Sequence, residues 1–227
     1  SGSFTVKNYV YLFHSEDLRS MIFGTLILAV VVAVISTILG TLGAIGAFYS
    51  SKKLKRPIHL MNQIPVVNAD VVTGFSICVL LIVFFKMDKA SYIPLVIGLV
   101  SLCSPFVYLS VIPRLKQMDP QLYEAALDLG CSPFGALRKV VLPQLTSGIV
   151  SGFMMSITLT LDDYFITTYT KPSMFDTIST YVVNATKGAQ TDVKTALWAL
   201  STIIFLIVIF VVIGMNHTGR KENDHEI

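Results

Sequence analysis

Two adjacent carboxylates, Asp162 and Asp163, are the only charged residues of the stretch SITLTLDDYFITTY. An ionised carboxylate at the centre of a bilayer costs about 2.5–3.5 kcal/mol on insertion scales, so two in succession require water, a counter-charge or a cationic ligand. Tyr164 and Phe165 follow directly and offer aromatic faces to a cation. The stretch therefore predicts a site for a positively charged group. A helix end in interfacial water, or a pair satisfied by a partner subunit, is the alternative.

A third acid, Asp70, lies in the apolar stretch IPVVNADVVTG, about 9 Å into its predicted helix at 1.5 Å per residue. Pro65, Asn68 and Gly74 make that helix imperfect, as is typical where backbone lines a cavity. If Asp70 faces the same interior as the acid pair, the three carboxylates mark a path that suits a cation and repels an anion. A structural carboxylate bonded to a nearby hydroxyl is the competing interpretation.

The composition places these acids in a membrane protein. Of 227 residues, 53% are hydrophobic and only 14% are charged, whereas a soluble domain carries about 25% charged residues. The net charge of +3 comes without a basic stripe interleaved with aromatics, which argues against nucleic acid as a partner. The three cysteines and four histidines are scattered, so neither a disulfide framework nor a metal site is expected.

Five apolar segments reach about the 20 residues that a helix needs to cross a bilayer; they are 21–49, 64–85, 92–112, 145–168 and 196–215. Pro94 and Pro105 lie in the third, which is therefore expected to be kinked or partly broken. We expect one helical membrane domain over 21–215, preceded by an extracytoplasmic segment, 1–20, and followed by a cytoplasmic tail, 216–227.

Lysine and arginine placement orients these spans. Ten basic residues fall on the side that holds the loop 114–144, and seven fall on the other. The excess predicts that this loop is cytoplasmic, which puts residue 1 outside. No signal peptide precedes the first span, so we expect a further span upstream of residue 1.

The loop contains the sequence EAALDLGCSPFGALRKVVLP, residues 124–143. Asp119 and Pro120 are suited to cap and open a helix before it. Tyr123, Ala126 and Gly130, together with Leu127, recur at helical spacing and predict a small, apolar face that a partner backbone approaches closely. An amphipathic helix lying on the membrane is the alternative.

The spacing resembles the EAA loop of ABC importer permeases, whose consensus is EAA-x3-G-x9-I-x-LP, with Val140 at the isoleucine position. In that family the loop forms a short coupling helix that docks in a groove of the cytoplasmic ATPase. The resemblance implies that the ATPase-coupling residues are Glu124, Ala125, Ala126, Gly130, Leu142 and Pro143.

Over nearly its whole length the chain is similar to permease subunits of spermidine/putrescine ABC importers. The resemblance implies an all-α, type I importer helical bundle in a bacterial inner membrane. It also implies a homologous second permease, a cytoplasmic ATPase dimer and an extracytoplasmic polyamine-binding protein. The chain lacks G-x4-G-K-[ST] and shows no nucleophile–base set, so we expect no cofactor and no enzymatic activity of its own, with ATP and Mg on the ATPase. A permease for ferric ion or thiamine, and a non-transporting scaffold, are the alternatives.

Small residues line one face of the first span, at Gly40, Gly43, Gly46 and Ala47. Such a face allows close helix packing in lipid. The spacing is GxxGxxG rather than GxGxxG, and no strand precedes it, so it is not a nucleotide-binding fingerprint. The face is expected to pack within the bundle or against a second permease.

Overall fold

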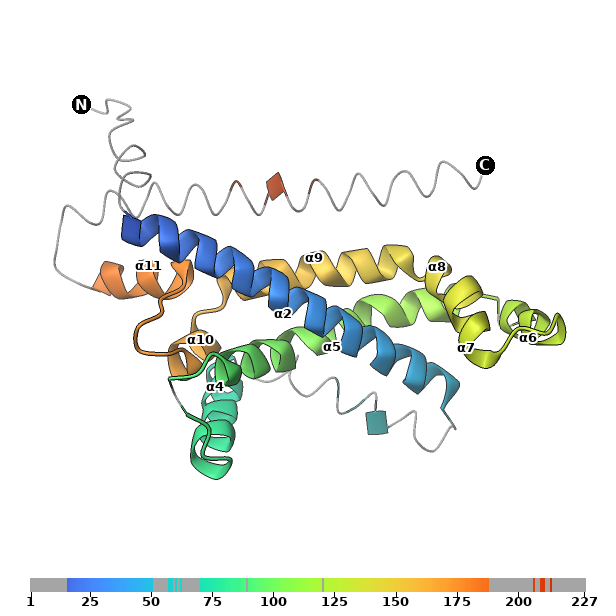
Figure 1. The fold of residues 1–227 in the computed structure, drawn as a ribbon, viewed down its shortest axis with the longest axis horizontal. Coiled ribbons are helices and arrows are strands. Elements are labelled where there is room, and N and C mark those ends of the chain that lie inside the picture. Colours follow the sequence, from blue (N-terminus) through green and yellow to red (C-terminus); the bar gives the residue numbers. More distant parts are fainter. Residues whose placement is uncertain are drawn as a thin grey trace.

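A computed structural model of the chain describes residues 16–50, 57, 58, 60, 62, 70–88, 90–119, 121–187, 206, 209, 210 and 213. Every regular element in these ranges is a helix (Figure 1). The longer helices are α2 (Glu16–Tyr49), α4 (Asp70–Cys78), α5 (Ile93–Gln117), α9 (Thr146–Asp162) and α11 (Ile178–Lys187). The shorter ones are the π-helices η1 (Val79–Phe84) and η2 (Leu137–Val141), and the α-helices α6 (Gln121–Asp128), α7 (Pro133–Ala136), α8 (Leu142–Gln144) and α10 (Phe165–Thr170).

Helices α2, α5 and α9 pack against one another and form the centre of the molecule. All three meet at Val107 of α5. A Cβ atom added to Gly40 of α2 would lie 2.6 Å from the Cβ of Val107, and one added to Gly152 of α9 would lie 3.0 Å from its Cγ1. The missing side chains allow the backbones to approach closely, as is usual for helices that associate in lipid.

The small-residue face of α2 divides between the interior and the exterior. Gly40 is buried and Ala47 is 1% exposed, so these two pack within the bundle. Gly43 and Gly46 are exposed, and a Cβ on Gly46 would meet no atom within 4 Å. Of the two predicted roles, packing within the bundle therefore applies to Gly40 and Ala47.

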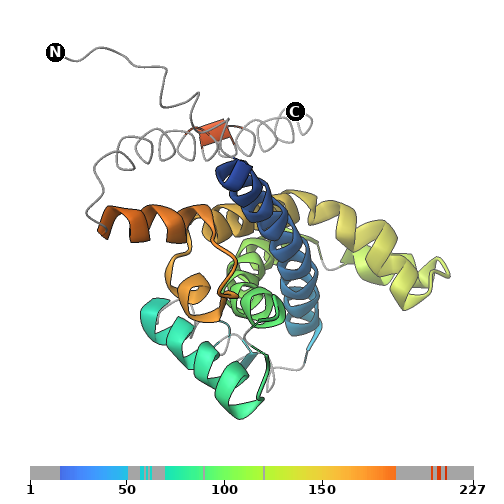
Figure 2. The same ribbon diagram turned by 60° about the vertical axis from the view of Figure 1, so that its left-hand side comes forward.

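The short helix α10 is held between α4 and α5 (Figure 2). Its Ile166 is fully buried and occupies a socket formed by two glycines. A Cβ on Gly74 of α4 would lie 3.1 Å from the Cα of Ile166, and one on Gly98 of α5 would lie 2.8 Å from its Cγ2. The Cys78 thiol also donates to the Tyr169 carbonyl over 3.3 Å. These contacts fix α10 on both sides.

The first and third predicted spans are present as single helices. By length and composition, 19–49 and 93–117 are able to cross a membrane. The third span is not broken, because α5 continues through Pro105 and for five residues beyond the predicted end. The expected kink stays a prediction. Proline removes one backbone hydrogen bond, and packing of α2 and α9 against α5 holds the helix together. Pro94 lies in the first turn, where no such bond is lost.

The fourth predicted span, 145–168, is wrong as a continuous helix. Helix α9 ends at Asp162, the chain is extended at Asp163, and a new helix, α10, begins at Phe165. Together with Pro133–Gln144, from which it departs at 70°, α9 makes a third span candidate if the bent pair is counted as one. The second predicted span is described from Asp70 onward, over α4 and η1. The fifth lies outside the described residues, apart from helical positions 206, 209, 210 and 213.

Candidate functional site

The predicted acid pair stands at the break between α9 and α10, and its two carboxylates differ in environment. Asp162, the last residue of α9, is exposed, and its backbone carbonyl accepts a hydrogen bond from the Ser179 hydroxyl over 3.2 Å. Asp163 is only 9% exposed. Its Oδ2 accepts from both the backbone N–H and the hydroxyl of Thr167, each over 2.8 Å. The pair predicted to act together is thus divided into an outward-facing and an inward-facing carboxylate.

The local conformation explains why the chain tolerates this break. Asp163 has φ −65° and ψ 122°, so it leaves α9 in an extended conformation. The first N–H groups of any helix lack partners within the helix, and a side-chain oxygen just before the helix can satisfy them. The Asp163 carboxylate does this for α10, where its negative charge also suits the positive end of the helix dipole. Asp162 carries its charge at the opposite, negative end of α9.

Tyr164 and Phe165, the two aromatic residues that follow the acids in the chain, contact each other. The rings of Tyr164 and Phe165 meet edge to face with centroids 5.3 Å apart, and Phe165 is 38% exposed. Asp70, the third predicted acid, begins α4, which packs against α10. The structure thus brings the helix that starts at Asp70 to the helix that follows the acid pair, while the Asp70 side chain lies outside the described residues.

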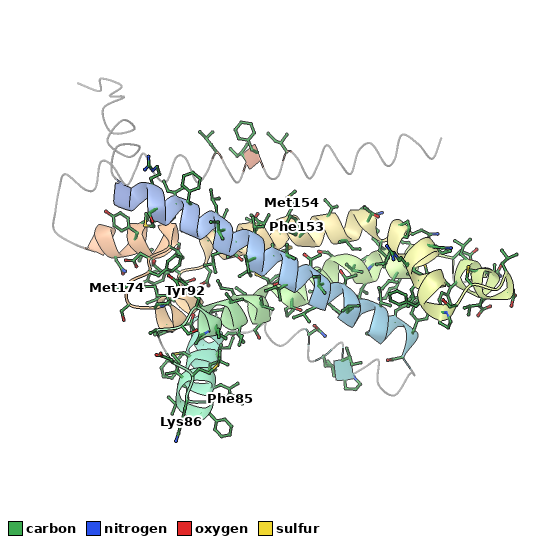
Figure 3. All side chains as sticks on the ribbon, in the orientation of Figure 1. Phe85, Lys86, Tyr92, Phe153, Met154 and Met174 are labelled. Carbon is green, nitrogen blue, oxygen red and sulfur yellow. The ribbon has the colours of Figure 1, made fainter. Side chains whose placement is uncertain are left out.

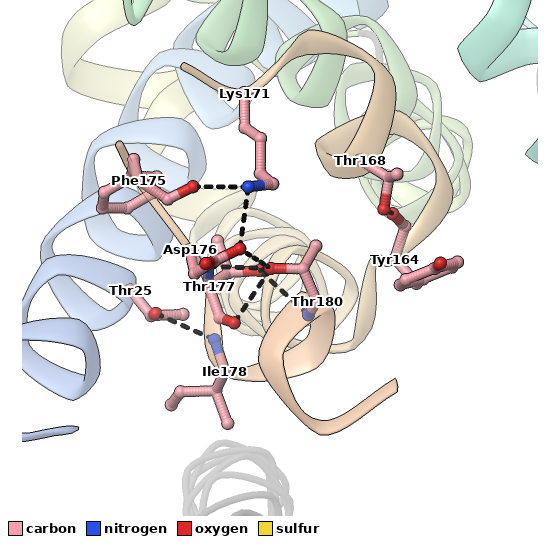
Figure 4. A network of polar contacts seen from close by, with 9 residues as sticks. All are labelled: Thr25, Tyr164, Thr168, Lys171, Phe175, Asp176, Thr177, Ile178 and Thr180. Atoms are coloured by element: carbon pink, nitrogen blue, oxygen red, sulfur yellow. Dashed lines mark hydrogen bonds and ion pairs between the residues drawn. The ribbon is translucent and has the colours of Figure 1, made fainter. Parts of the chain in front are cut away.

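A polar network fixes the loop that joins α10 to α11 (Figure 4). The Lys171 ammonium lies 2.7 Å from Oδ1 of Asp176 and donates to the Phe175 carbonyl over 2.8 Å. The loop is tied to α2, where the hydroxyl of Thr25 accepts from the Ile178 N–H over 3.2 Å. Sequence reasoning missed this network, whose only local signal was a pair of opposite charges around a proline.

Apolar and aromatic side chains protrude near that network and at the tip of η1 (Figure 3). Met174, in the loop itself, is fully exposed, and Tyr92 at the start of α5 packs its ring edge to face on Phe175, with centroids 5.3 Å apart. At the tip of η1, Phe85 is 61% exposed and Lys86 has a positive φ of 52°. Lys86 thus turns the chain out of the π-helix in the conformation that usually favours glycine.

The sequence from Glu124 to Pro143, here called the EAA segment, lies at the opposite end of the bundle from α10 and α11 (Figure 1). Helix α6 begins as expected, since Asp119 Oδ1 accepts from the N–H of Gln121 over 2.9 Å. The helix ends at Asp128, and Gly130, two residues further on, has φ +83°. There the Cys131 N–H donates to the Ala126 carbonyl over 3.0 Å, and the Gly130 N–H donates to the Leu127 carbonyl over 2.9 Å. This is a Schellman cap, which explains the glycine of the motif.

The face of α6 that was predicted to meet a partner is partly wrong. Ala126 is only 7% exposed, and the ring of Tyr123 packs on Tyr49 with centroids 5.0 Å apart, so both turn toward the chain's own bundle. The outward side instead carries Glu124 and Ala125, followed by Leu129, which is 86% exposed. Phe134, in the next helix, is 75% exposed. Sequence reasoning missed these two large apolar residues, because the pattern had not shown which side of α6 the bundle covers.

The Leu142–Pro143 pair of the motif lies where the chain bends by 70° into α9. Proline has no N–H, and its ring crowds the carbonyl four residues earlier. The turn that precedes Pro143 is accordingly widened into the π-helix η2. The hydroxyl of Thr146 donates to the Pro143 carbonyl over 2.7 Å and stabilises the corner. Leu142 and Pro143 are both exposed at this corner.

No three His, Cys, Asp or Glu residues lie together as a possible metal site in the part of the chain that the structure describes. The three cysteines are free. The expectation that ATP and Mg bind a partner subunit, and that this chain holds no cofactor, stays a prediction.

Comparisons with known proteins agree on one family. Residues 38–218 match the family model for the binding-protein-dependent transport system inner membrane component. The chain is 28% identical to the spermidine/putrescine transport system permease protein PotC of Escherichia coli K12, over 96% of this chain and 81% of that one. It is also 28% identical to the putrescine transport system permease protein PotI of the same organism, over 89% and 73%.

Solved structures share the fold. A bacterial ABC transporter involved in alginate import superposes with a TM-score of 0.77 at 17% identity, over 97% of this chain and 85% of that one. The MetNI methionine ABC transporter superposes with a TM-score of 0.69 at 14% identity, over 91% and 98%. The chain belongs to the family of binding-protein-dependent transport system inner membrane components, the permease subunits of ABC importers that work with an ATPase and a substrate-binding protein.

Proposed function

We propose that this permease imports polyamines, spermidine or putrescine, and that Asp162 contacts them on their path. Two relatives named for polyamine transport, each 28% identical, support the substrate class. The observation that carries the assignment is the exposed Asp162 carboxylate at the carboxyl end of α9. A helix of this length has a partial negative charge at that end, so the carboxylate and the dipole attract a cation together.

The surroundings of Asp162 suit an extended chain of ammonium groups. A polyamine carries several positive charges separated by methylene groups, and aromatic faces attract ammonium groups as well as methylenes. Tyr164 and Phe165 directly follow the acid pair in the chain, and Phe165 is partly exposed. Asp70, on the helix that packs against α10, supplies a second acidic level of the path in this proposal.

The partners of the complex follow the same proposal. A homologous second permease completes the path, an ATPase dimer binds ATP and Mg, and an extracytoplasmic protein delivers the polyamine. In this proposal residues 21–215 form one membrane domain, and the EAA segment lies in the cytoplasm. ATP binding closes the ATPase dimer, and the EAA segment transmits that movement to the helices through Glu124, Ala125 and the protruding Leu129 and Phe134. Ala126, Gly130, Leu142 and Pro143 hold its shape.

The substrate assignment is tested in proteoliposomes that contain the whole complex and its binding protein. Spermidine and putrescine should stimulate ATP hydrolysis and enter the vesicles. Asp162→Asn should raise the half-saturating polyamine concentration about tenfold or more, because a charge-assisted contact is worth about 1.5–3 kcal/mol. Asp88→Asn is the matched control, since Asp88 is an exposed acid in the loop after η1. Equal behaviour of the two variants would remove Asp162 from the path.

Competition separates the alternatives. If ferric ion or thiamine stimulates hydrolysis and polyamines do not, the chain is an importer permease for another solute. If no solute stimulates hydrolysis and no ATPase co-purifies, a non-transporting scaffold is the better interpretation.

Coupling is tested at the protruding residues of the EAA segment. Leu129→Ser and Glu124→Ala should reduce co-purification of the ATPase and abolish stimulated hydrolysis, because both side chains face away from the bundle. Gln117→Ala, at the end of α5, is an exposed control outside the segment. Normal stimulation in the Leu129 variant would show that the ATPase docks elsewhere.

A further inference from the structure

We infer that the two adjacent acids have different tasks: Asp163 is a positioning residue whose carboxylate maintains the helix break, and the break presents Asp162 to the cargo. This inference rests on the proposed polyamine function for the role of Asp162. The role of Asp163 itself follows from hydrogen bonds within this chain.

The decisive contact is the one between Asp163 and Thr167. In an unbroken α-helix the N–H of residue 167 would donate to the backbone carbonyl of residue 163. In this structure it donates to Oδ2 of the Asp163 side chain over 2.8 Å, and the Thr167 hydroxyl donates to the same oxygen over 2.8 Å. The carboxylate thus replaces the backbone acceptor that a continuous helix would use. A residue without a side-chain acceptor offers no such replacement and favours the continuous helix.

The break is fixed on both sides, which makes this short link decisive. On the α10 side, Ile166 is fixed in the socket of Gly74 and Gly98. On the α9 side, Ser179 of α11 donates to the Asp162 carbonyl. Only Asp163 and Tyr164 lie between α9 and α10. A change at Asp163 therefore alters the direction in which α9 ends, and with it the place of the Asp162 carboxylate.

Burial separates the two acids in the same way. Asp163 is 9% exposed and already engaged by Thr167, whereas Asp162 is exposed. A cargo molecule can therefore reach Asp162 without breaking the hydrogen bonds between the Asp163 carboxylate and α10. The positive charge of a polyamine needs the charge of Asp162, while the cap needs only an acceptor oxygen at position 163.

The test exploits that last difference. Asparagine retains an acceptor oxygen and lacks the charge, so Asp163→Asn should keep the half-saturating spermidine concentration within about twofold of the original complex. Asp163→Ala should raise it about tenfold, with the maximal rate little changed. Thr167→Val, which loses one of the two hydrogen bonds, should lie between them. If Asp163→Asn loses as much affinity as Asp162→Asn, then Asp163 contacts the cargo and the inference is wrong.

A second measurement does not depend on the substrate. The second measurement uses a complex in which Cys78 is replaced by serine, which keeps a donor for the Tyr169 carbonyl, and Cys103 and Cys131 are replaced by alanine. In this complex a cysteine introduced by Asp162→Cys should react readily with a cationic methanethiosulfonate. Adding Asp163→Ala should slow that reaction at least fivefold, and adding Asp163→Asn should not. Ser173→Cys, in the exposed loop, is the control whose rate should stay constant.

The two experiments distinguish the two claims. If polyamines fail to stimulate the complex but the thiol rates change as expected, the polyamine assignment is wrong and the positioning role stands. If the thiol rate is the same with alanine and with aspartate at position 163, the positioning role is wrong whatever the substrate. If Asp163→Ala does not assemble, the comparison of Asp163→Asn with Asp162→Asn decides between positioning and contact.

Discussion

Replacing Gly40 by alanine should destabilise the bundle at the point where its three central helices meet. The new Cβ would lie 2.6 Å from the Val107 Cβ and 2.8 Å from the carbonyl oxygen of Ser104. Carbon atoms pack at about 3.5–4.0 Å, so α2 and α5 would have to separate by about 1 Å. One of the two neighbours is backbone, which cannot move aside by changing its rotamer. Overpacking of this kind costs about 1–3 kcal/mol.

Gly46→Ala is the matched control on the same helix. A Cβ there would meet no atom within 4 Å. Both substitutions gain the same intrinsic preference of alanine over glycine in a helix, about 1 kcal/mol. That gain cancels when the two variants are compared, so the difference between them isolates the contact with α5. Gly43→Ala, with a nearest approach of 4.0 Å to the Tyr108 ring, should behave like Gly46→Ala.

The assay is thermal denaturation of the purified complex in detergent at one scan rate. A difference of 1–3 kcal/mol corresponds to roughly 2–12 °C for a chain of this size. The apparent Tm of Gly40→Ala should therefore fall clearly below that of Gly46→Ala. Equal midpoints would refute the crossing at Val107 as the tight contact of the bundle.

Three further predictions concern the ends of the molecule. Gly130→Val should weaken stimulated ATP hydrolysis more than Gly130→Asn, since φ +83° costs about 1–2 kcal/mol for most residues and asparagine tolerates it better; equal losses would contradict the role of the cap. Gly98→Ala should lower the apparent Tm, because its Cβ would clash with the Ile166 Cγ2. In a double-mutant cycle, adding Ile166→Ala removes that Cγ2 and should recover part of the loss. Strict additivity of the two effects would show that the socket is not tight. Lys171→Gln should lower the free energy of unfolding by about 1 kcal/mol or less, because Asp176 is 45% exposed, and the effect should shrink in high salt. A salt-independent loss would place its cause in packing.

Local spacing in the sequence predicted helix α6 and its first hydrogen bond, whereas the cap at Gly130 was recognised only in the structure. The Asp119 cap lies next to the helix that it begins, and the fixed distance from Ala126 to Gly130 is the length of one helical cap. Hydropathy alone likewise predicted the spans 21–49 and 92–112, where the structure has single helices over 19–49 and 93–117. In each case the residues that determine the structure are neighbours in the chain.

The break at Asp163 could not be predicted in this way. No glycine or proline marks it, and the surrounding threonines and apolar residues continue a helical pattern. The break depends on Gly74 and Gly98, which lie far away in the sequence and form the socket for Ile166. The orientation of α6 was equally hidden, because Tyr123 packs on Tyr49 of a different helix. Both outcomes depend on tertiary contacts that a single sequence does not display.

Helix α9 is held closely against α5 near its start, at Gly148 and Gly152. A Cβ atom on Gly148 would lie 3.0 Å from the Ser110 carbonyl oxygen, and one on Gly152 would lie 3.0 Å from the Val107 Cγ1. At 1.5 Å per residue, Asp162 lies about 15 Å beyond Gly152, whereas the 70° corner lies about 9 Å away on the other side. A tilt of α9 about these contacts would therefore displace Asp162 further than it displaces the corner.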